Sequence, residues 1–430
     1  MTKSSREVAI VGAGAMGLSA AFYAAKAGHR VTVFEHDHVP GGMAAHFDFD
    51  GISIERFYHF VCKADQSTFD LLAELGIGDR MRWRPTSMGY FMDGRLHRWG
   101  DPLALLALPG LNPLDKLRYG LLAFLSTKRS NWTGLDRITA DRWIKRWVGP
   151  RAYEKLWRPL LYLKFFEHAD NISAAWIWTR LKRLGTSRRS LFQEELGYIE
   201  GGSETLVRAL CDAITSLGGK IRLGATVQEV TAANGVVTGV RTADGTFPAE
   251  RVICTIPTPY VSKLVPALPA DWKRKYDAIP NIGVVCVMFR LKRSVTPHFW
   301  VNIADSRIDI PGIIEFSRLR PLPDTVICVP YYMPPTHPKW VKDDAFFVEE
   351  AFGYLQMINP ALVRDDIVAT RVGRLRHAQP VCAPRFLETL PDIVTPIEGL
   401  QIADTCYYYP EDRGISEGAR LSRIIAERIG

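Results

Sequence analysis

Three glycines near the amino terminus have the spacing that a dinucleotide-binding turn requires. Gly12, Gly14 and Gly17 follow directly after a short apolar run at residues 8–11. The first glycine permits a tight turn, the second lets the backbone approach a pyrophosphate, and the third allows a helix to pack closely on a strand. Because the spacing alone is a weak signal, its meaning depends on the elements on either side.

Those neighbouring elements have the order that the motif needs. Residues 18–27 are rich in alanine and predict a helix, and residues 30–34 predict a second strand that ends at Glu35. The start of the helix, at Ala15 and Met16, would offer free N–H groups and a partial positive charge to phosphates. Glu35 can accept hydrogen bonds from both ribose hydroxyls of an adenosine, and its charge disfavours the 2′-phosphate of NADP.

A second glycine pair, Gly41 and Gly42, follows the acid after Pro40. By itself this pair could form an ordinary Pro-Gly-Gly turn. In this position it resembles the extended fingerprint of FAD-binding oxidoreductases, in which the pair lets the chain pass close to the phosphates of the flavin. The resemblance implies FAD as the cofactor and puts Met43 beside it. Amine oxidases have an arginine in place of Met43, which argues against true monoamine oxidation.

The middle of the chain carries a related pattern. A helical stretch at residues 204–217 is followed by apolar runs separated by turn glycines. These runs predict strands at residues 220–223, 226–230, 236–242 and 252–255. The order resembles the second half of the FAD domain in the flavin amine oxidase, protoporphyrinogen oxidase and phytoene desaturase superfamily. In that superfamily a valine contacts the adenine through its backbone, and Val227 is the matching position.

The carboxyl terminus is similar to the end of that superfamily, with a strand, an acidic loop and a helix. Asp404 and Asp412 lie in the loop. The resemblance implies that one of these two acids contacts the ribityl chain, and the sequence leaves both open. It also implies that the following helix points at the isoalloxazine ring. Gly414, Ile415 and Ser416 at the helix start would then stabilise negative charge on the reduced flavin.

The resemblance implies an α/β protein with a Rossmann-like FAD-binding domain (GR2-type) and a mixed α+β substrate domain. We assign residues 1–80, 196–280 and 385–430 to the FAD-binding domain, and residues 81–195 and 281–384 to the substrate domain. The first part of the substrate domain is rich in tryptophan at helical spacing, which we interpret as helix core packing. Short apolar runs in its second part predict a sheet beneath the flavin.

Three residues are candidates for the chemistry itself. Lys164 is a single cation within an apolar run, where burial would lower its pKa and let it act as a base. The resemblance implies a lysine of this kind near N5 of the flavin. His59, in the Arg56-Phe57-Tyr58-His59 group, follows the second glycine turn at a distance that could place it over the flavin. Tyr408 could flank the flavin face or only pack. For Lys164 and His59 the alternative is a surface charge or a paired structural residue.

The resemblance implies an FAD-dependent oxidoreductase that takes a hydride from a substrate C–H bond to flavin N5, as oxidases, dehydrogenases and desaturases do. Basic and apolar residues together suggest an amphipathic or anionic small-molecule substrate. One alternative is a non-redox isomerase resembling UDP-galactopyranose mutase, in which arginines would clamp a diphosphate. The candidate arginines are Arg180, Arg183, Arg188, Arg189 and Arg318. The other alternative is a flavin-binding protein without catalytic activity.

Composition restricts the partners, metal sites and cellular compartment that we expect for this protein. The 430 residues are 47% hydrophobic and 23% charged, as in ordinary globular proteins, and the net charge of +8 favours anionic partners. We see no zinc finger, RNA-binding signature or basic arm, and therefore expect no nucleic-acid partner. Seven scattered cysteines without a CxxC pair predict free thiols and no metal site in a reducing compartment. We expect a cytoplasmic protein.

One apolar segment has three interpretations. Residues 103–125 are strongly apolar, with Lys116, Arg118, Lys128 and Arg129 within or beside them. The sequence has no uninterrupted apolar stretch of the ~20 residues that a spanning helix needs. We therefore rank a buried core first, the lining of a hydrophobic substrate tunnel second, and peripheral contact with the inner face of a membrane third.

Overall fold

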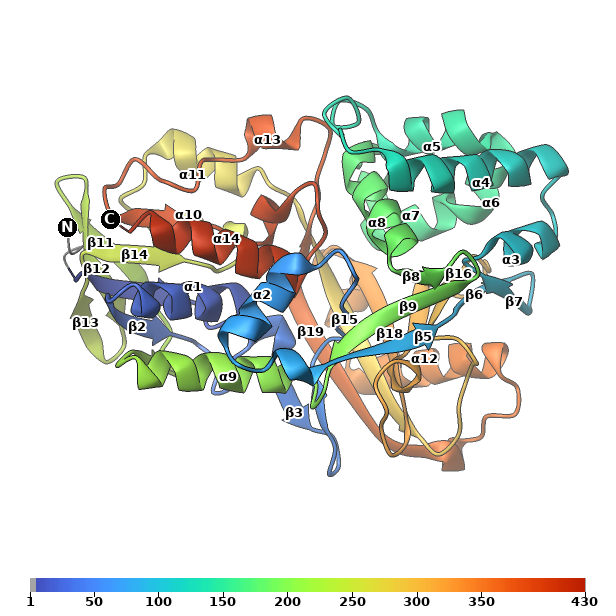
Figure 1. The fold of residues 1–430 in the computed structure, drawn as a ribbon, viewed down its shortest axis with the longest axis horizontal. Coiled ribbons are helices and arrows are strands. Elements are labelled where there is room, and N and C mark those ends of the chain that lie inside the picture. The colour runs from blue at the N-terminus through green and yellow to red at the C-terminus, as the bar shows by residue number, and fades with distance from the viewer. Residues whose placement is uncertain (1–4, 430) are drawn as a thin grey trace.

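The computed structural model describes residues 5–429 and contains a parallel sheet of five strands (Figure 1, left). The strand order is β10, β2, β1, β14, β20, and every neighbouring pair is parallel. The bounds are β1 Glu7–Val11, β2 Arg30–Phe34, β10 Lys220–Arg222, β14 Arg251–Cys254 and β20 Leu400–Ile402. The beginning, middle and end of the chain thus meet in one sheet, which confirms the expected Rossmann-like α/β fold.

Both faces of this sheet are covered, which explains why its central strands β1 and β14 are mostly apolar. On one face, Val8 and Ile10 pack in a cluster with helices, and on the other, Ala9 and Val11 pack beneath a three-stranded meander. The helices of the first face are α1 Ala15–Lys26, α2 Gln66–Glu74, α9 Ser203–Ser216 and α14 Ile415–Glu427. The second face is covered by β11 Glu229–Ala233, β12 Val236–Thr242, β13 Gly245–Pro248, α10 Val261–Leu264 and α11 Ala270–Asp277.

One strand begins later than the sequence indicates. We expected a strand at residues 226–230, but β11 starts at Glu229, and Val227 lies in the preceding loop. The reason is that this loop first bonds to the end of β2: the Ala225 N–H donates to the Glu35 carbonyl at 2.7 Å. The chain therefore pairs with β12 only after it has passed the acid, and Val227 stays at the edge of the site.

A second sheet of seven strands lies beside the first (Figure 1, lower right). Its order is β19, β15, β18, β17, β16, β6, β7. The bounds are β6 Met88–Met92, β7 Arg95–Trp99, β15 Asn281–Leu291, β16 Trp300–Ile303, β17 Gly312–Glu315, β18 Thr325–Met333 and β19 Ile367–Pro380. Alternate residues of its central strands, such as Val285 and Tyr331, pack against α12, Asp344–Ile358. Their neighbours Val284 and Tyr332 point the other way and line a cavity.

Smaller sheets and one short helix join these two parts. They are the β3–β4 hairpin, His46–Asp48 with Ser53–Glu55, and a sheet of β5 Met81–Thr86, β9 Gln193–Ile199 and β8 Arg188–Ser190. Helix α13 spans Phe386–Thr389.

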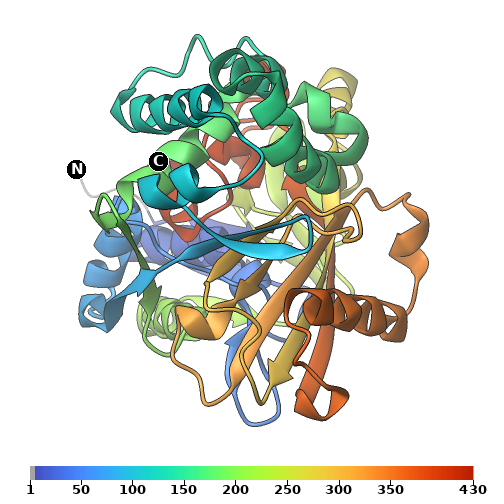
Figure 2. The same cartoon turned by 90° about the vertical axis from the view of Figure 1, so that its right-hand side faces the viewer.

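Six helices form a layer above the second sheet (Figures 1 and 2). They are α3 Pro102–Ala107, α4 Pro113–Lys128, α5 Ala140–Val148, α6 Pro150–Leu156, α7 Arg158–Phe165 and α8 Ala174–Thr186. Trp143, Trp176 and Trp178 are buried in the core of this layer, as the helical spacing predicted. The core interpretation of residues 103–125 is wrong for most of the segment, because one face of α3 and α4 is open to solvent.

Candidate functional site

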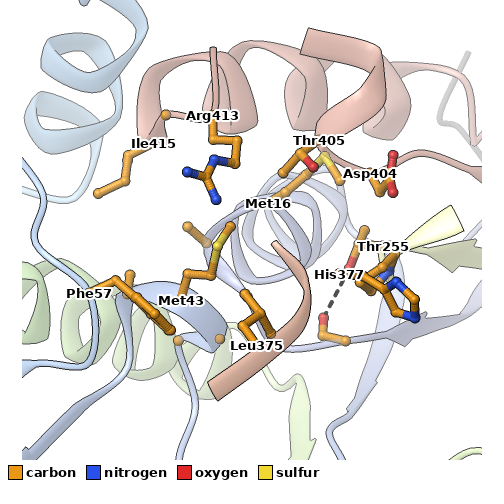
Figure 3. A pocket seen from close by; sticks show the side chains of 18 of the residues that line it. Met16, Met43, Phe57, Thr255, Leu375, His377, Asp404, Thr405, Arg413 and Ile415 are labelled. Atoms are coloured by element: carbon orange, nitrogen blue, oxygen red, sulfur yellow. Dashed lines mark hydrogen bonds between the residues drawn. The ribbon is translucent and has the colours of Figure 1, made fainter. Parts of the chain in front are cut away.

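A cavity of about 820 Å³ is lined by the loops of the parallel sheet, one face of the second sheet, and helices α7 and α8. Figure 3 shows side chains from these separate parts of the chain, including Met16, Met43, Phe57 and Arg413, facing the same open space. Fourteen of the cofactor-binding candidates named from the sequence line it together. They are Gly12, Gly14, Ala15, Met16, Glu35, Gly41, Gly42, Met43, Val227, Asp404, Asp412, Gly414, Ile415 and Ser416. Gly17 lies behind them, in α1.

The two glycine turns are packed against each other at one end of this cavity. The Gly41 N–H donates to the Ala13 carbonyl at 2.8 Å, and a Cβ on Gly42 would lie 3.1 Å from the Gly14 Cα. Gly17 has a packing role, because its Cβ would lie 1.9 Å from the Gly12 carbonyl oxygen. The two turns therefore form a continuous backbone surface without side chains, as a diphosphate requires.

The surroundings of Gly14 indicate that this surface leaves space for a bound ligand. Its backbone is extended, with φ −68° and ψ 173°, which any residue can adopt. A Cβ on Gly14 would meet no atom within 4 Å. Neither backbone strain nor packing within the chain therefore demands a glycine here. The open space in front of it, at the amino terminus of α1, fits the pyrophosphate of FAD.

Glu35 is held in place at the end of β2 as a buried carboxylate. Its Oε2 accepts a hydrogen bond from the Ala13 N–H at 2.7 Å, and its Oε1 accepts one from the Asp37 N–H at 3.0 Å. Burial acts to raise the pKa of Glu35, but hydrogen bonds from His36, Asp37 and Ala13 outweigh burial and lower it. The side chain is thus a fixed anion, suited to accept hydrogen bonds from ribose hydroxyls.

The start of α14 faces the same cavity. Gly414 is its N-cap and contributes no side chain, so the first N–H groups of the helix are not capped from within the described chain. Gly414, Ile415 and Ser416 all line the cavity. A helix amino terminus open to a binding site carries a partial positive charge. This end of the cavity can therefore hold the negative charge of a reduced flavin.

The structure gives the two candidate acids different surroundings. Asp404 accepts hydrogen bonds from the N–H groups of Cys406 and Thr258, at 2.8 and 2.7 Å, so it caps the loop after β20. Asp412 pairs with Arg180 of α8, and its Oδ1 is buried without a partner in the described chain. Asp404 is thus the acid on the side of the parallel sheet, and Asp412 is the acid that faces the helical layer.

Lys164 lies at the far end of the cavity, among aromatic rings. Its Nζ is 5.0 Å from the ring centre of Tyr332, 5.1 Å from that of Trp176 and 5.8 Å from that of Phe165. Within residues 5–429, Lys164 forms no ion pair and no hydrogen bond. Burial lowers its pKa well below the usual value, and the charges of Arg180 and Arg413 act in the same direction against the opposing effect of Asp412.

The other two catalytic candidates are less favourably placed. His59 lines the cavity, and burial lowers its pKa, which disfavours the charged form of the ring. Its Nδ1 is buried without a partner in the described chain. Tyr408 also lines the cavity, but its hydroxyl lies against Gly418 of α14, where an added Cβ would be 2.8 Å away. Arg56 does not line the cavity and pairs with Asp37.

Sequence reasoning missed three residues that the fold brings into the site. Arg413 lines the cavity, with its guanidinium bonded to the Ala378 carbonyl and 3.4 Å from the Tyr332 hydroxyl. Its place directly before the predicted helix start was the one signal available. Tyr332 lies in an apolar strand and gave no signal. Glu411 lines the cavity one residue before Asp412.

Glu411 predicts a pH dependence of stability that a Glu411→Gln variant should remove. Burial raises the pKa of Glu411 to about 7, and the charge of Glu417 adds to the rise. The folded protein thus holds this proton more tightly than the unfolded chain, whose pKa is about 4.3. The stability that this proton gives to the folded protein is fully present at low pH, and it is lost as the pH rises through 7. The variant should melt at a higher temperature than wild type at pH 8, with the gap narrowing towards pH 5.

An exposed carboxylate provides the control for that measurement. Glu388 is a solvent-exposed acid, so Glu388→Gln should shift the melting temperature little and equally at all pH values. A Glu411→Gln effect that is the same at pH 5 and pH 8 would contradict the buried-acid interpretation.

The arginines expected for a diphosphate clamp do not gather. Arg180 and Arg183 line the cavity, but they are paired with Asp412 and Asp65. Arg188 donates to backbone carbonyls, including that of Gly100 at 3.0 Å, and Arg318 is paired with Glu315. Arg188, Arg189 and Arg318 do not line the cavity. Two of the five arginines expected for the clamp therefore reach the cavity, and both are already paired with acids.

The paired glycine turns, the acid at the end of β2 and the open helix end define a dinucleotide-binding site beside a substrate pocket. Comparison with known sequences agrees, since residues 17–349 match the family described as flavin containing amine oxidoreductase. The chain belongs to this family, and it is an FAD-dependent oxidoreductase.

Individual relatives show how far this likeness extends. The chain is 26% identical to a 15-cis-phytoene desaturase of Narcissus pseudonarcissus, over 98% of this chain and 79% of that protein. A structure from Exiguobacterium, assigned as a protoporphyrinogen oxidase, aligns with a TM-score of 0.78 and 18% identity over 99% of both chains. Reduced UDP-galactopyranose mutase aligns with a TM-score of 0.76 and 14% identity, over 99% of this chain and 95% of that one. At these identities the two structural matches show the shared fold alone.

Proposed function

We propose that the protein removes a hydride from a C–H bond of an amphipathic, anionic small molecule. The observation that carries this proposal is Lys164, an amine set among aromatic rings with no ion-pair partner in the described chain. Tyr58 and Trp300, whose rings meet edge to face at 5.6 Å, extend the aromatic lining on the same side. Arg413 adds a cation that could receive the anionic part of the substrate.

Residues at the other end of the cavity would hold the cofactor. The turns at Gly12–Gly17 and Gly41–Gly42 would receive the diphosphate, and Glu35 the adenosine ribose. The start of α14 would stabilise the negative charge that accompanies reduction. The chemistry supplied by bound FAD is the uptake of a hydride from carbon.

Lys164 would accept the proton that accompanies hydride removal. Its lowered pKa leaves more of the amine neutral near neutral pH than an ordinary lysine, and a neutral amine is the form that can act as a base. The substrate would lose one hydride and one proton, so that a double bond forms between the two atoms concerned. Met43 stands where amine oxidases have an arginine, and it adds an apolar side chain to the cavity (Figure 3).

We propose that residues 1–80, 196–280 and 385–430 form the FAD-binding domain and that residues 81–195 and 281–384 form the substrate domain. The arrangement of the sheets supports this division. All five strands of the parallel sheet fall within the first set, and all seven strands of the second sheet fall within the second set.

Anaerobic reduction of the bound FAD tests the proposed reaction. The purified yellow protein would be mixed, without oxygen, with pools of lipid phosphates, tetrapyrroles and nucleotide sugars. We expect one pool of anionic, apolar molecules to bleach the flavin and to yield a product that lacks two hydrogens. A pool compound that is rearranged only by pre-reduced protein, with no net electron transfer to an acceptor, would contradict the proposal.

A further inference from the structure

Helices α3 and α4 expose an apolar face that no other described part of the chain covers. Its members are between 38% and 69% exposed. They are Leu103, Leu106, Leu114, Leu117, Leu121, Phe124 and Leu125, called here the α3–α4 face. Single exposed leucines are normal on protein surfaces, but a contiguous group of large apolar side chains marks an interaction site.

The helical periodicity shows that this group is one surface. In α4, Leu114, Leu117, Leu121 and Phe124 are three or four residues apart and therefore lie along one side of the helix. The opposite side is occupied by Leu122, which is buried in the core of the helical layer. A helix with one side on the core normally turns polar residues to water, whereas α4 is apolar on both sides.

The two helices present this surface as a fixed unit. The Lys116 side chain of α4 donates to the Leu106 carbonyl of α3 at 2.5 Å. The Arg118 guanidinium donates to the carbonyls of Trp147 and Arg146, at 2.8 and 2.7 Å, and so ties α4 to α5. Figure 2 shows α4 at the outer edge of the helical layer, away from the two sheets.

Basic groups border the α3–α4 face at the carboxyl end of α4, and the exposed Asp93 near the loop between the two helices is paired with Lys155. Lys128 and Arg129 are exposed at the end of α4, and the Lys182 side chain joins them by donating to the Arg129 carbonyl at 2.9 Å. Asp115 is the one acid within residues 102–130, and it is buried. Apolar side chains rimmed by lysine and arginine match a bilayer with anionic headgroups, because the chains enter the boundary of the acyl region while the cations meet phosphates.

We propose that the α3–α4 face docks the protein on the surface of an anionic lipid bilayer. Leucines and Phe124 enter the boundary between headgroups and acyl chains, and Lys128 and Arg129 bind lipid phosphates. The attachment is peripheral, since the described residues contain no helix that is long and apolar enough to cross a membrane. This docking is independent of the reaction proposed above.

Co-sedimentation of the FAD-loaded protein with vesicles tests the docking. Vesicles of phosphatidylcholine with phosphatidylglycerol should bind it, and those of phosphatidylcholine alone should bind it more weakly. A Leu117→Gln, Leu121→Gln, Phe124→Gln triple variant should lose at least about tenfold in partitioning to the anionic vesicles. A Lys128→Gln, Arg129→Gln variant should lose about fivefold for each charge removed, on the anionic vesicles only.

A triple variant at three separate exposed positions elsewhere in the chain provides the control. Leu217, Val363 and Leu387 are similarly exposed, and their replacement by glutamine should leave vesicle binding unchanged. Flavin absorbance and melting temperature show whether each variant is folded. Wild-type protein that does not bind anionic vesicles would overturn the membrane proposal. A dimer in solution that the α3–α4 triple variant converts to a monomer would overturn it in favour of a protein partner.

Discussion

A Gly14→Val variant is expected to fold normally and to contain almost no FAD. The backbone of Gly14 is in an extended conformation that valine adopts readily, and its Cβ position is free of contacts within 4 Å. The new side chain would instead occupy the space in front of the α1 amino terminus. Since hydrogen bonds to charged groups are worth ~1.5–3 kcal/mol each, the loss of two backbone–phosphate contacts would weaken FAD binding at least about a hundredfold.

Variants at two other glycines distinguish a loss of FAD binding from a loss of folding stability. Gly353 in α12 also has no atom within 4 Å of its Cβ position, so Gly353→Val should retain FAD and stability. Gly17→Val should destabilise the protein itself, because its Cβ would overlap the Gly12 carbonyl oxygen. Stoichiometric flavin absorbance and thermal melting measure both properties. A Gly14→Val protein that retains a full complement of FAD would show that the cofactor does not bind at this turn.

Lys164→Met is expected to abolish most of the turnover while leaving FAD in place. Removing a general base costs roughly 10²–10⁴-fold in rate. Wild-type turnover should rise as pH increases through the lowered pKa of Lys164, because the neutral amine is the active form, and this rising limb should be missing from the variant. The measurement is a pH profile of kcat with the substrate found by anaerobic screening.

A second lysine and a stability measurement exclude a structural explanation. Lys145 of α5 also lies over an aromatic ring, that of Tyr153 at 4.5 Å, but outside the cavity, so Lys145→Met should leave turnover unchanged. Burial disfavours the charged form of Lys164, so the folded protein gains stability as pH rises from the lowered pKa towards the ordinary one. Methionine carries no charge, and Lys164→Met should be as stable as wild type or more stable at pH 7. An unchanged pH profile in this variant would remove Lys164 from the mechanism.

The cofactor end of the site could be predicted because its parts are local. Gly12, Gly14 and Gly17 are held by one turn and one helix, and Glu35 follows at the end of the next strand. Residue type and spacing there fix the geometry almost without help from the rest of the chain. The exception was Val227, where we expected a strand and found a loop bonded to the end of β2.

Apart from the candidate Lys164, the substrate end could not be predicted in the same way. Lys164, Tyr332 and Arg413 come from a helix, a strand and a loop that are far apart in sequence, and the packing of separate elements brings them together. The sequence also could not separate Asp404 from Asp412, since the difference lies in partners such as Arg180 that are distant along the chain.

The apolar segment at residues 103–125 is a second part of the chain whose environment the sequence could not predict. Hydrophobicity and period identify helices, and they give the same pattern whether an apolar side faces a core or the solvent. Only the packing of α4 against α5 and α8 decides that Leu122 is buried while Leu117 is exposed. The sequence by itself thus determined the class of fold and the cofactor, which depend on short-range backbone geometry. The tertiary structure alone decided the substrate lining and the exposed face, because both depend on which distant elements come into contact.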